Sequence, residues 1–484
     1  MEPITKPSQS HASLLSKLLL SKLSNFMWSC TLFFVGFSEL FFILQNMEAR
    51  FHFLLLCFIL ICYLLKQLLS RPSAVYLVDF SCYKPPNSCK IPFSVFIDKA
   101  SKSQVFDQES LTFMAKTFHA SGLSEEDTYG PPLYHNITPR MGDQNDAIRE
   151  VHMVFFPIID DLLAKTNVSP TDIDILIINC SGFCPSPSLS SIVINNYSMR
   201  SDIKSYNISG SGCSASALGI DMAQRLLRVH ENSNAIVLST EILSTGFYTG
   251  NDKSKLILNC VFRMGSAAIL LSNKKEAKKH AKYRVVRTVR TQSAFLDGGY
   301  FAATLEEDSV GKVGFSLRKT TLQIAGEALR SNITTLGSQV LPLSEKFRYH
   351  VSLFKLRFLN KDSDRVYVPN FMSVIQHICL PCTSKKFIMI MAKMLKLSKW
   401  DIEPTLMTLH KFGNQSSTSL WYELAYLEAK QKVKKGDTVW LLGVGSGPKC
   451  TSVLLKSVAR PLFGDESKNG PWADCIQQYP LIIP

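Results

Sequence analysis

The stretch Asn207–Gly219, NISGSGCSASALG, decides the interpretation of this 484-residue sequence. A short polar segment leads into the Gly-Ser-Gly triplet at 210–212, which precedes Cys213, and the small residues that follow continue in a helical pattern. Glycine lets the backbone turn sharply and lets a ligand approach it closely. The stretch therefore predicts a turn that opens a helix and carries Cys213. The alternative interpretation is a buried cysteine in a turn rich in glycine and serine.

Cys213 in this setting is a candidate nucleophile. Backbone N–H groups and the macrodipole at a helix N-terminus stabilise a thiolate, so we expect the pKa of Cys213 to be lowered. A thiolate at this position can attack a thioester carbonyl and hold the acyl group covalently. The turn thus indicates acyl transfer through a covalent intermediate.

On both sides of this turn, short apolar runs alternate with helical stretches. Buried strands are expected at 173–178, 235–239, 267–271 and 439–444. Helical periodicity covers 145–165, 215–229 and 421–434. The alternation predicts an α/β fold with buried strands. The lysine-rich stretch 274–282 is expected to be an exposed connection between two α/β halves.

The composition is that of a globular enzyme with some membrane-facing sequence. Hydrophobic residues make up 46% and charged residues 19% of the chain, whereas disorder requires fewer apolar residues. The formal net charge of +14 creates a positive field toward anions, such as an anionic membrane surface or a phosphorylated cofactor. Nucleic acid is not expected as a partner, because the basic residues are scattered and no zinc-finger or RNA-binding pattern accompanies them.

The cysteines indicate a reducing, cytosol-facing environment. Thirteen cysteines are spaced irregularly, and some, such as Cys57 and Cys62, lie inside apolar runs, so free thiols are favoured over disulfides. Cys379 and Cys382 form a CxxC pair without a second pair, which favours ordinary thiols over a zinc site. We expect no metal and no bound cofactor.

Two apolar runs near the N-terminus predict a membrane anchor. The runs cover 26–44 and 51–69, and each is close to the roughly 20 residues that a helix needs to cross a bilayer. Residues 1–25 would form a cytosolic tail and 26–69 a transmembrane hairpin, because lysines flank its two ends. Glu39 is unfavourable in the first run unless it is paired. A cleaved signal peptide or a buried core hairpin is the alternative.

Beyond the cysteine loop, further segments follow one family pattern. They are VYLVDFSCYKPP (75–86), NCSGFCPSPSLSSIVINNYSMRSDIKSYN (179–207), FRMGSAAILLSN (262–273), AGEALRSNITTLG (325–337), YVPNF (367–371), LHKFGNQSSTSLWYELAYLEAK (409–430) and GSGPKC (445–450). Together they resemble plant 3-ketoacyl-CoA synthases, the condensing enzymes of very-long-chain fatty-acid elongation. The resemblance implies the fold of thiolases, with one α/β half at 71–275 carrying the nucleophile and a second at 280–484 carrying His and Asn motifs.

The resemblance also implies a chemistry. The cysteine takes the acyl chain from acyl-CoA, malonyl-CoA loses CO₂, and its carbanion attacks the acyl thioester to give a 3-ketoacyl-CoA. A His and an Asn of the family donate hydrogen bonds to the oxygen on which charge develops. Asn414 matches that Asn, and His410 matches a family histidine with a supporting or orienting role. A turn-capping Asn after Gly413 and a structural hydrogen-bonding His are the alternatives.

One motif departs from the family. The family sequence His-Phe-Cys-Ile-His-Ala-Gly-Gly aligns with residues 377–384, so His377 matches the first histidine and Pro381 replaces the catalytic second one. A further family histidine is Gln292. Proline is neither a donor nor a base, and loss of one oxyanion donor lowers turnover on the order of 100- to 1000-fold. The chain is then a weak or inactive paralogue, a rearranged site with His377 as a candidate, or the product of a local reading-frame disturbance at 381–384.

Two functions follow from the resemblance. The first is an acyltransferase at the endoplasmic reticulum membrane that faces the cytosol, uses acyl-CoA and malonyl-CoA, and works with an elongase reductase and dehydratase, as a homodimer or heterodimer. The second is a catalytically impaired scaffold or dimer partner in the elongase complex. Pro381 and Gln292 favour the scaffold, whereas Cys213, His410 and Asn414 favour the enzyme. A soluble chalcone-synthase-like enzyme is disfavoured by the hairpin.

Overall fold

The computed structural model divides the chain into two compact units, Met1–Ser73 and Ala74–Pro484. It describes residues 31, 33–39, 41, 49–69, 73–126, 128–139, 141–318, 320–358, 367–458 and 470–481. The predicted cytosolic tail at 1–25 and parts of both predicted membrane runs lie outside these residues.

In the smaller unit, helix α2 (Ala49–Leu69) carries much of the second apolar run. Its phenylalanines are largely exposed, with Phe51 at 67% and Phe58 at 63%. Glu39 of the first run is paired with the ring of His52 at the start of α2. Within the described residues, no helix is long and apolar enough to cross a membrane.

In the larger unit, nine of the described strands form one mixed sheet in the order β3-β2-β4-β5-β1-β6-β11-β10-β9. They are β1 (Tyr76–Cys82), β2 (Ile175–Asn179), β3 (Lys204–Ile208), β4 (Asn234–Thr240), β5 (Ser266–Ser272), β6 (Tyr283–Gln292), β9 (His377–Cys379), β10 (Thr438–Gly445) and β11 (Lys449–Ser457). Strand β1 pairs with β5 along most of its length but with β6 only through Tyr76 and Leu77. The sheet therefore has two halves that meet at a short junction.

Two helices pack between these halves. Helices α7 (Ala215–Val229) and α15 (Ser419–Ala429) share a buried core with Val237 of β4 and Leu441 of β10. Strands β2, β4 and β5 are buried along their whole length, because helices cover both of their faces. The sequence enters α7 directly after the Cys213 turn, so this turn lies at the end of the central layer.

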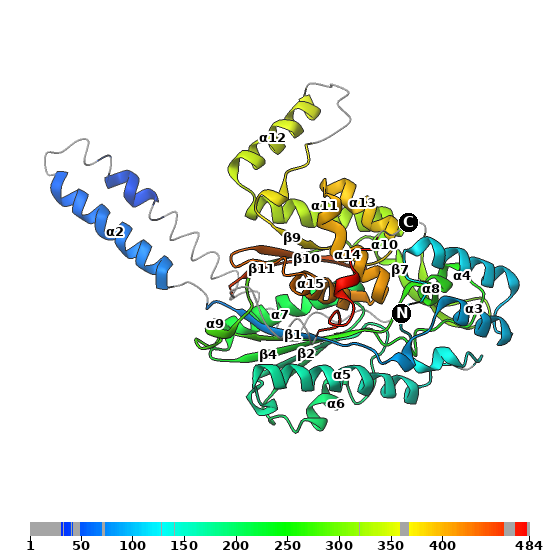
Figure 1. Cartoon of the computed structure of the whole chain (residues 1–484). Helices are drawn as coiled ribbons and strands as arrows, with labels where there is room; N and C mark the ends of the chain where they lie inside the picture. The colour runs from blue at the N-terminus through cyan, green and yellow to red at the C-terminus, as the bar shows by residue number, and fades with distance from the viewer. Residues whose placement is uncertain are drawn as a thin grey trace, which may run out of the picture. The chain divides into compact units, whose positions relative to one another are not determined.

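Outer helices cover the other face of each half, as Figure 1 shows. Helices α5 (Gln144–Thr166) and α6 (Leu189–Asn196) pack on the first half. The second half carries α11 (Thr321–Val340), α13 (Lys385–Leu395) and α14 (Lys399–Phe412). The remaining elements are α3 (Phe93–Lys102), α4 (Gln108–Ser121), α8 (Lys253–Val261), α9 (Ala277–His280), α10 (Asp297–Tyr300), α12 (Leu343–Phe358) and the hairpin β7 (Ala303–Glu307)–β8 (Val313–Leu317).

The predicted α/β organisation is confirmed. Each of the four apolar runs is a strand, and the first two helical stretches are α5 and α7. The third predicted helix, 421–434, is wrong at its end: α15 stops at Ala429, because Gln431 has a left-handed backbone with φ 53°. The division into halves at 71–275 and 280–484 stays a prediction.

Candidate active site

Cys213 lies on a tight 3₁₀ turn, Gly212–Ser214, between β3 and α7. Gly212 has φ 51°, and its N–H donates to Ser181 Oγ at 2.9 Å. A Cβ at Gly445, at the end of β10, would lie 2.1 Å from Ser211 O. Glycine is therefore required where the turn and the β10–β11 loop approach each other.

The pKa of the half-buried Cys213 thiol is raised from 9.0 to about 11. Burial is the main cause, the charge of Glu241 adds to it, and the hydroxyl of Ser416, whose Oγ lies 3.6 Å from Cys213 Sγ, opposes it. The expected lowering of this pKa is wrong. Cys213 precedes α7 instead of lying in its first turn, and desolvation of the thiolate outweighs the helix dipole.

Asn414 follows α14 and is buried. Its backbone N–H donates to Val261 O at 3.1 Å, and its carbonyl accepts from Arg263 N at 2.8 Å. Its side-chain Oδ1 accepts from Ser416 N at 2.8 Å, which is the turn-capping contact of the alternative interpretation. Among the described residues, no hydrogen bond uses Asn414 Nδ2. The capping bond thus orients the amide and leaves its NH₂ group to donate.

Two residues that connect to Cys213, Ser416 and Glu241, were not among the candidates predicted from the sequence. Ser416 Oγ donates to Glu241 Oε2 at 3.1 Å, and Glu241 Oε1 accepts from the backbone N–H groups of Ser181 at 2.9 Å and Gly182 at 2.6 Å. Burial raises the pKa of Glu241 despite these hydrogen bonds. The sequence signal that could have identified Glu241 is its position directly after β4. The end of this strand lies at the same edge of the sheet as the Cys213 turn.

The structure does not bring His377 to Cys213. His377 begins β9, where its Nε2 lies 3.0 Å from Asp437 Oδ2, and its backbone pairs with Val439. The Cys213 turn meets the other end of β10, at Gly443 and beyond. Four residues of strand separate Val439 from Gly443, or roughly 13 Å.

His410 lies in the last turn of α14, four residues before Asn414. Its backbone carbonyl accepts from Ser124 N at 2.9 Å, and its ring centroid is 6.3 Å from that of Tyr479, edge to face. These contacts fix the end of the helix from which the Asn414 loop departs. Its supporting role stays a prediction.

The segment around Pro381 borders the Asn414 loop. The N–H of Leu380 donates to Glu423 Oε2 at 2.9 Å, and the Cys382 thiol donates to Gly413 O at 3.8 Å. Burial, and then the charges of Glu423 and Cys213, raises the pKa of Cys382. Pro381 therefore lies between two residues that contact this region, and its side chain offers neither a donor nor a base.

The other departure, Gln292, lies at a strand end away from the CxxC pair. Gln292 ends β6 and pairs with Lys449 of β11. In the part of the chain that the structure describes, no group of three or more His, Cys, Asp or Glu residues could hold a metal ion, and the cysteines are free.

Two family models match the chain. Residues 67–358 match the FAE1/Type III polyketide synthase-like protein family, and residues 374–457 match the 3-oxoacyl-(acyl-carrier-protein) synthase III C terminal family. Together they cover both halves of the sheet.

Curated relatives and solved structures agree with these matches. The chain is 45% identical to 3-ketoacyl-CoA synthase 6 of Arabidopsis thaliana over 86% of the chain and 82% of the relative. It is 44% identical to 3-ketoacyl-CoA synthase 11 of the same plant, over 91% and 86%. PKS-I from the brown alga Ectocarpus siliculosus (TM-score 0.61, 14% identity, 80% and 100% covered) and 1,3,6,8-tetrahydroxynaphthalene synthase from Streptomyces coelicolor A3(2) (0.60, 16%, 79% and 99%) show the same fold.

Proposed function

The chain belongs to the plant 3-ketoacyl-CoA synthase family, the condensing enzymes of very-long-chain fatty-acid elongation, and we propose that it joins malonyl-CoA to a long-chain acyl group held on Cys213. The observation that carries this proposal is the meeting of two distant segments at Ser416. Its hydroxyl lies 3.6 Å from Cys213 Sγ, and its N–H is bound by the side chain of Asn414. Ser416 therefore contacts both the nucleophile and the amide.

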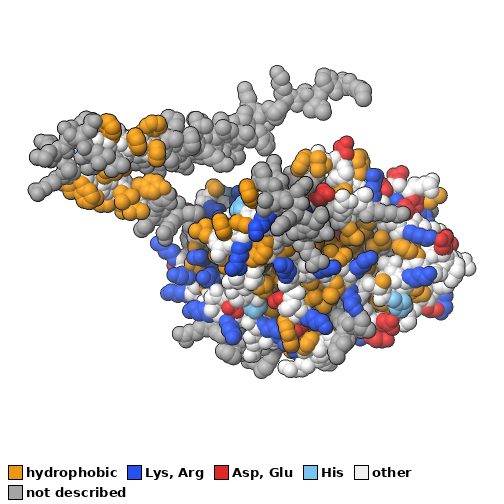
Figure 2. Space-filling view, turned by 90° about the horizontal axis from the view of Figure 1, so that it is seen from above, with side chains coloured by type: hydrophobic (Ala, Val, Ile, Leu, Met, Phe, Trp, Pro, Cys, Tyr) orange, Lys and Arg blue, Asp and Glu red, His pale blue; other side chains and the backbone are white. Residues whose placement is uncertain are grey.

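In the first step the sulfur of Cys213 attacks the carbonyl carbon of the acyl-CoA thioester. A new C–S bond forms, the bond to the CoA sulfur breaks, and the acyl group remains on the enzyme. Figure 2 shows Lys and Arg side chains spread across one face of the molecule. This positive charge suits the phosphates of CoA and an anionic lipid surface.

In the second step malonyl-CoA loses CO₂, and its carbanion attacks the carbonyl carbon of the acyl thioester on Cys213. A C–C bond forms, the bond to the Cys213 sulfur breaks, and the 3-ketoacyl-CoA leaves. Negative charge develops on the malonyl thioester oxygen, where a preorganised donor is most effective. The amide of Asn414 supplies such a donor, since its Oδ1 is held by Ser416 N. Pro381 contributes none, so this chain relies on Asn414 more than a relative with histidine at that position.

Expression in microsomes with labelled malonyl-CoA and a panel of acyl-CoAs tests the proposal. Product from the wild type that disappears in Cys213→Ala supports condensation. Pro381 and Gln292, which replace two histidines of the family, favour the second candidate, a scaffold or dimer partner without turnover. No product from the wild type, but product from Pro381→His, would assign that role instead. Sequencing of the transcript across 381–384 tests the reading-frame hypothesis.

We also propose that residues 26–69 anchor the chain in the endoplasmic reticulum membrane with the larger unit in the cytosol. The exposed phenylalanines of α2 and the pairing of Glu39 with His52 support this, because the pair reduces the penalty of a carboxylate in lipid. Protease treatment of sealed microsomes should digest the larger unit from outside. Digestion only after the membrane is opened would contradict the orientation.

Dimerisation and an elongase assembly complete the proposal. Strand β3 lies at an edge of the sheet and alternates half-buried and exposed side chains, so its free edge can pair with a second strand. Sedimentation of the detergent-solubilised chain should give a dimer, either with itself or with an active relative. Co-purification of the reductase and dehydratase tests the larger assembly.

A further inference from the structure

Cys213, Ser416 and Glu241 form a line of polar atoms across the site. We propose that Glu241 is the general base for Cys213 and that the hydroxyl of Ser416 carries the proton between them. Ser416 Oγ lies 3.6 Å from Cys213 Sγ and 3.1 Å from Glu241 Oε2. The inference rests on the proposed function, in which Cys213 must lose a proton to accept an acyl group.

The chemistry of a hydroxyl suits this position. A serine hydroxyl has one proton to donate and lone pairs to accept. In the structure the Ser416 hydroxyl can donate to either Cys213 Sγ or Glu241 Oε2, and when its proton points to Glu241 its oxygen can accept from the thiol of Cys213. Ser416 is fixed in this orientation from both sides: its N–H is bound by Asn414 Oδ1 at 2.8 Å, and its backbone adopts φ 57°. A left-handed backbone at a residue with a side chain is held only where the surroundings enforce it.

The groups around Cys213, Ser416 and Glu241 favour the protonated form of Glu241, so this carboxylate can take up a proton. Glu241 faces the thiol of Cys180, whose Sγ lies 3.8 Å from its Oε1, and buried Glu150 interacts with it electrostatically. Cys382 interacts with Cys213, and Lys449 Nζ donates to Gly210 O at 3.2 Å, at the rim of the turn. Among the described residues, no cation forms an ion pair with Glu241. A desolvated carboxylate without a cation holds a proton more firmly than an exposed one.

The step balances as follows. The sulfur of Cys213 bonds to the acyl carbonyl carbon while its proton moves to Ser416 Oγ and the hydroxyl proton of Ser416 moves to Glu241 Oε2. The bond between the acyl carbon and the CoA sulfur breaks. Glu241 returns the proton by the same path to the departing CoA thiolate, which leaves as the free thiol. The enzyme regains its original charge, and no imidazole is needed.

Proton transfer from Cys213 through Ser416 to Glu241, here called the relay, is needed because proline replaces the family's histidine at position 381. The Cys213 thiol has a pKa raised to about 11, so little thiolate exists at neutral pH without a base. Pro381 is not such a base. Glu241 is the carboxylate that a single hydroxyl connects to the sulfur.

The test is the pH dependence of Cys213 alkylation by iodoacetamide in the full-length chain, followed by mass spectrometry of the Cys213 peptide. Glu241→Gln and Ser416→Ala should each lower the rate near pH 7.5 by roughly 100-fold, the usual contribution of a general base. Ser416→Ala keeps the backbone N–H that Asn414 binds. Glu241→Asp should recover part of the rate.

If the proposal is wrong, the alkylation rate of Glu241→Gln should rise instead of fall. If Glu241 were only a nearby negative charge, its removal would lower the thiol pKa and make Cys213 react faster. Unchanged or faster alkylation in Glu241→Gln would overturn the proposal, and a normal rate in Ser416→Ala would overturn the path through the hydroxyl. Because the Ser416 hydroxyl by itself lowers the pKa of Cys213, Ser416→Ala cannot decide alone. If Glu241→Gln does not fold, Glu241→Asp decides, because it keeps the negative charge but withdraws the carboxylate from Ser416, and an unchanged rate in that variant would overturn the proposal.

Glu150→Gln is the matched control. Glu150 is also buried, and its pKa is raised to about 7, but it accepts hydrogen bonds from Leu243 N and Ser244, not from Ser416. Because Glu150 acts on this site only through its charge next to Glu241, its replacement should change Cys213 alkylation far less than Glu241→Gln does. Because alkylation needs no condensation, a working relay in a chain that makes no product would refute the proposed function and leave this inference standing.

Discussion

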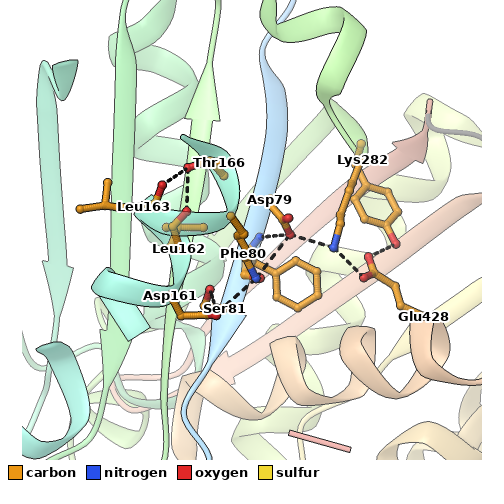
Figure 3. Close-up of polar contacts among 11 residues, drawn as sticks. Asp79, Phe80, Ser81, Asp161, Leu162, Leu163, Thr166, Lys282 and Glu428 are labelled. Atoms are coloured by element: carbon orange, nitrogen blue, oxygen red, sulfur yellow. Dashed lines mark hydrogen bonds and ion pairs between the residues drawn. The ribbon is translucent and has the colours of Figure 1, made fainter. Parts of the chain in front are cut away.

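The larger unit contains two buried polar clusters, one in which acids are paired with a lysine and one in which acids are held by uncharged donors. At one, Lys282 points between Asp79 of β1 and Glu428 of α15, as Figure 3 shows. Its Nζ lies 2.8 Å from Asp79 Oδ1 and 3.1 Å from Glu428 Oε2, and Tyr283 OH donates to Glu428 Oε1 at 2.8 Å. Burial alone would lower the pKa of Lys282, but the charges of Glu428 and Asp79 raise it.

At the other cluster, beside Cys213, acids are buried without an ion pair among the described residues. Glu241 and Glu150 are held by backbone N–H groups and hydroxyls, and burial raises the pKa of both. The difference teaches which cluster is structural. Paired charges lock the junction of the two sheet halves in one protonation state, whereas buried acids whose pKa is raised, and which have no ion pair among the described residues, can exchange protons.

Replacement of Lys282, the cation of the first cluster, should have the largest effect on stability. Lys282→Met removes the cation that Asp79 and Glu428 share and leaves Asp79 with Lys165 at 3.8 Å and Glu428 with the hydroxyl of Tyr283. This loss should lower the free energy of unfolding by about 3–5 kcal/mol. Thermal unfolding of the detergent-solubilised chain measures the loss. Lys84→Met is the control, because the exposed Lys84–Asp474 pair (2.6 Å) should contribute less than about 1 kcal/mol. Equal losses in both variants would contradict the structural role of the buried cluster.

Near the second cluster, replacement of Asn414 should have the largest effect on the decarboxylation of malonyl-CoA. Asn414→Ala should lower the release of CO₂ from labelled malonyl-CoA roughly 100- to 1000-fold, or about 3–4 kcal/mol, because an oxyanion donor is lost. Asn414→Asp keeps an oxygen to accept from Ser416 N but loses the NH₂ donor, so it should be equally impaired. Normal activity in Asn414→Asp would show that the amide only caps the turn.

The sequence was sufficient to predict those elements whose structure depends on residues close together in the chain. The apolar runs that became β2, β4, β5 and β10 are continuous because both faces of these strands are buried. The Cys213 turn was recognisable because its glycines are required by local geometry. Both features are written within a few residues.

Contacts between distant segments were not predictable in this way. Ser416 and Glu241 are 175 residues apart, and Lys282 and Glu428 are 146 apart, so no local pattern marks either pair. His377 was a candidate because of its motif, but the register of β9 against β10 places it at the wrong end of the strand. The pKa of Cys213 depends on burial, which only the assembled core determines.

A pH-dependent stability should distinguish the acids near Cys213 from the paired charges. The pKa of Glu150 is raised from 4.5 to about 7 by burial, so between these values the folded chain holds a proton that the unfolded chain has lost. The stabilisation is therefore complete below pH 4.5 and is lost as the pH rises to 7, by up to about 3 kcal/mol. Glu150→Gln should lack this decline. Thermal unfolding at pH 5 and pH 8 measures it, and parallel losses in both proteins would contradict the shift.

The smallest expected effect separates the backbone of Ser416 from its hydroxyl. Ser416 adopts φ 57°, which is strained for any residue with a Cβ but not for glycine. Ser416→Gly and Ser416→Ala both remove the hydroxyl, so Cys213 should react equally slowly in the two variants. Ser416→Gly should nevertheless unfold with about 1 kcal/mol more free energy than Ser416→Ala, because it relieves the strain. If the two were equally stable but differed in Cys213 reactivity, the position of the backbone, and not the hydroxyl, would control the thiol.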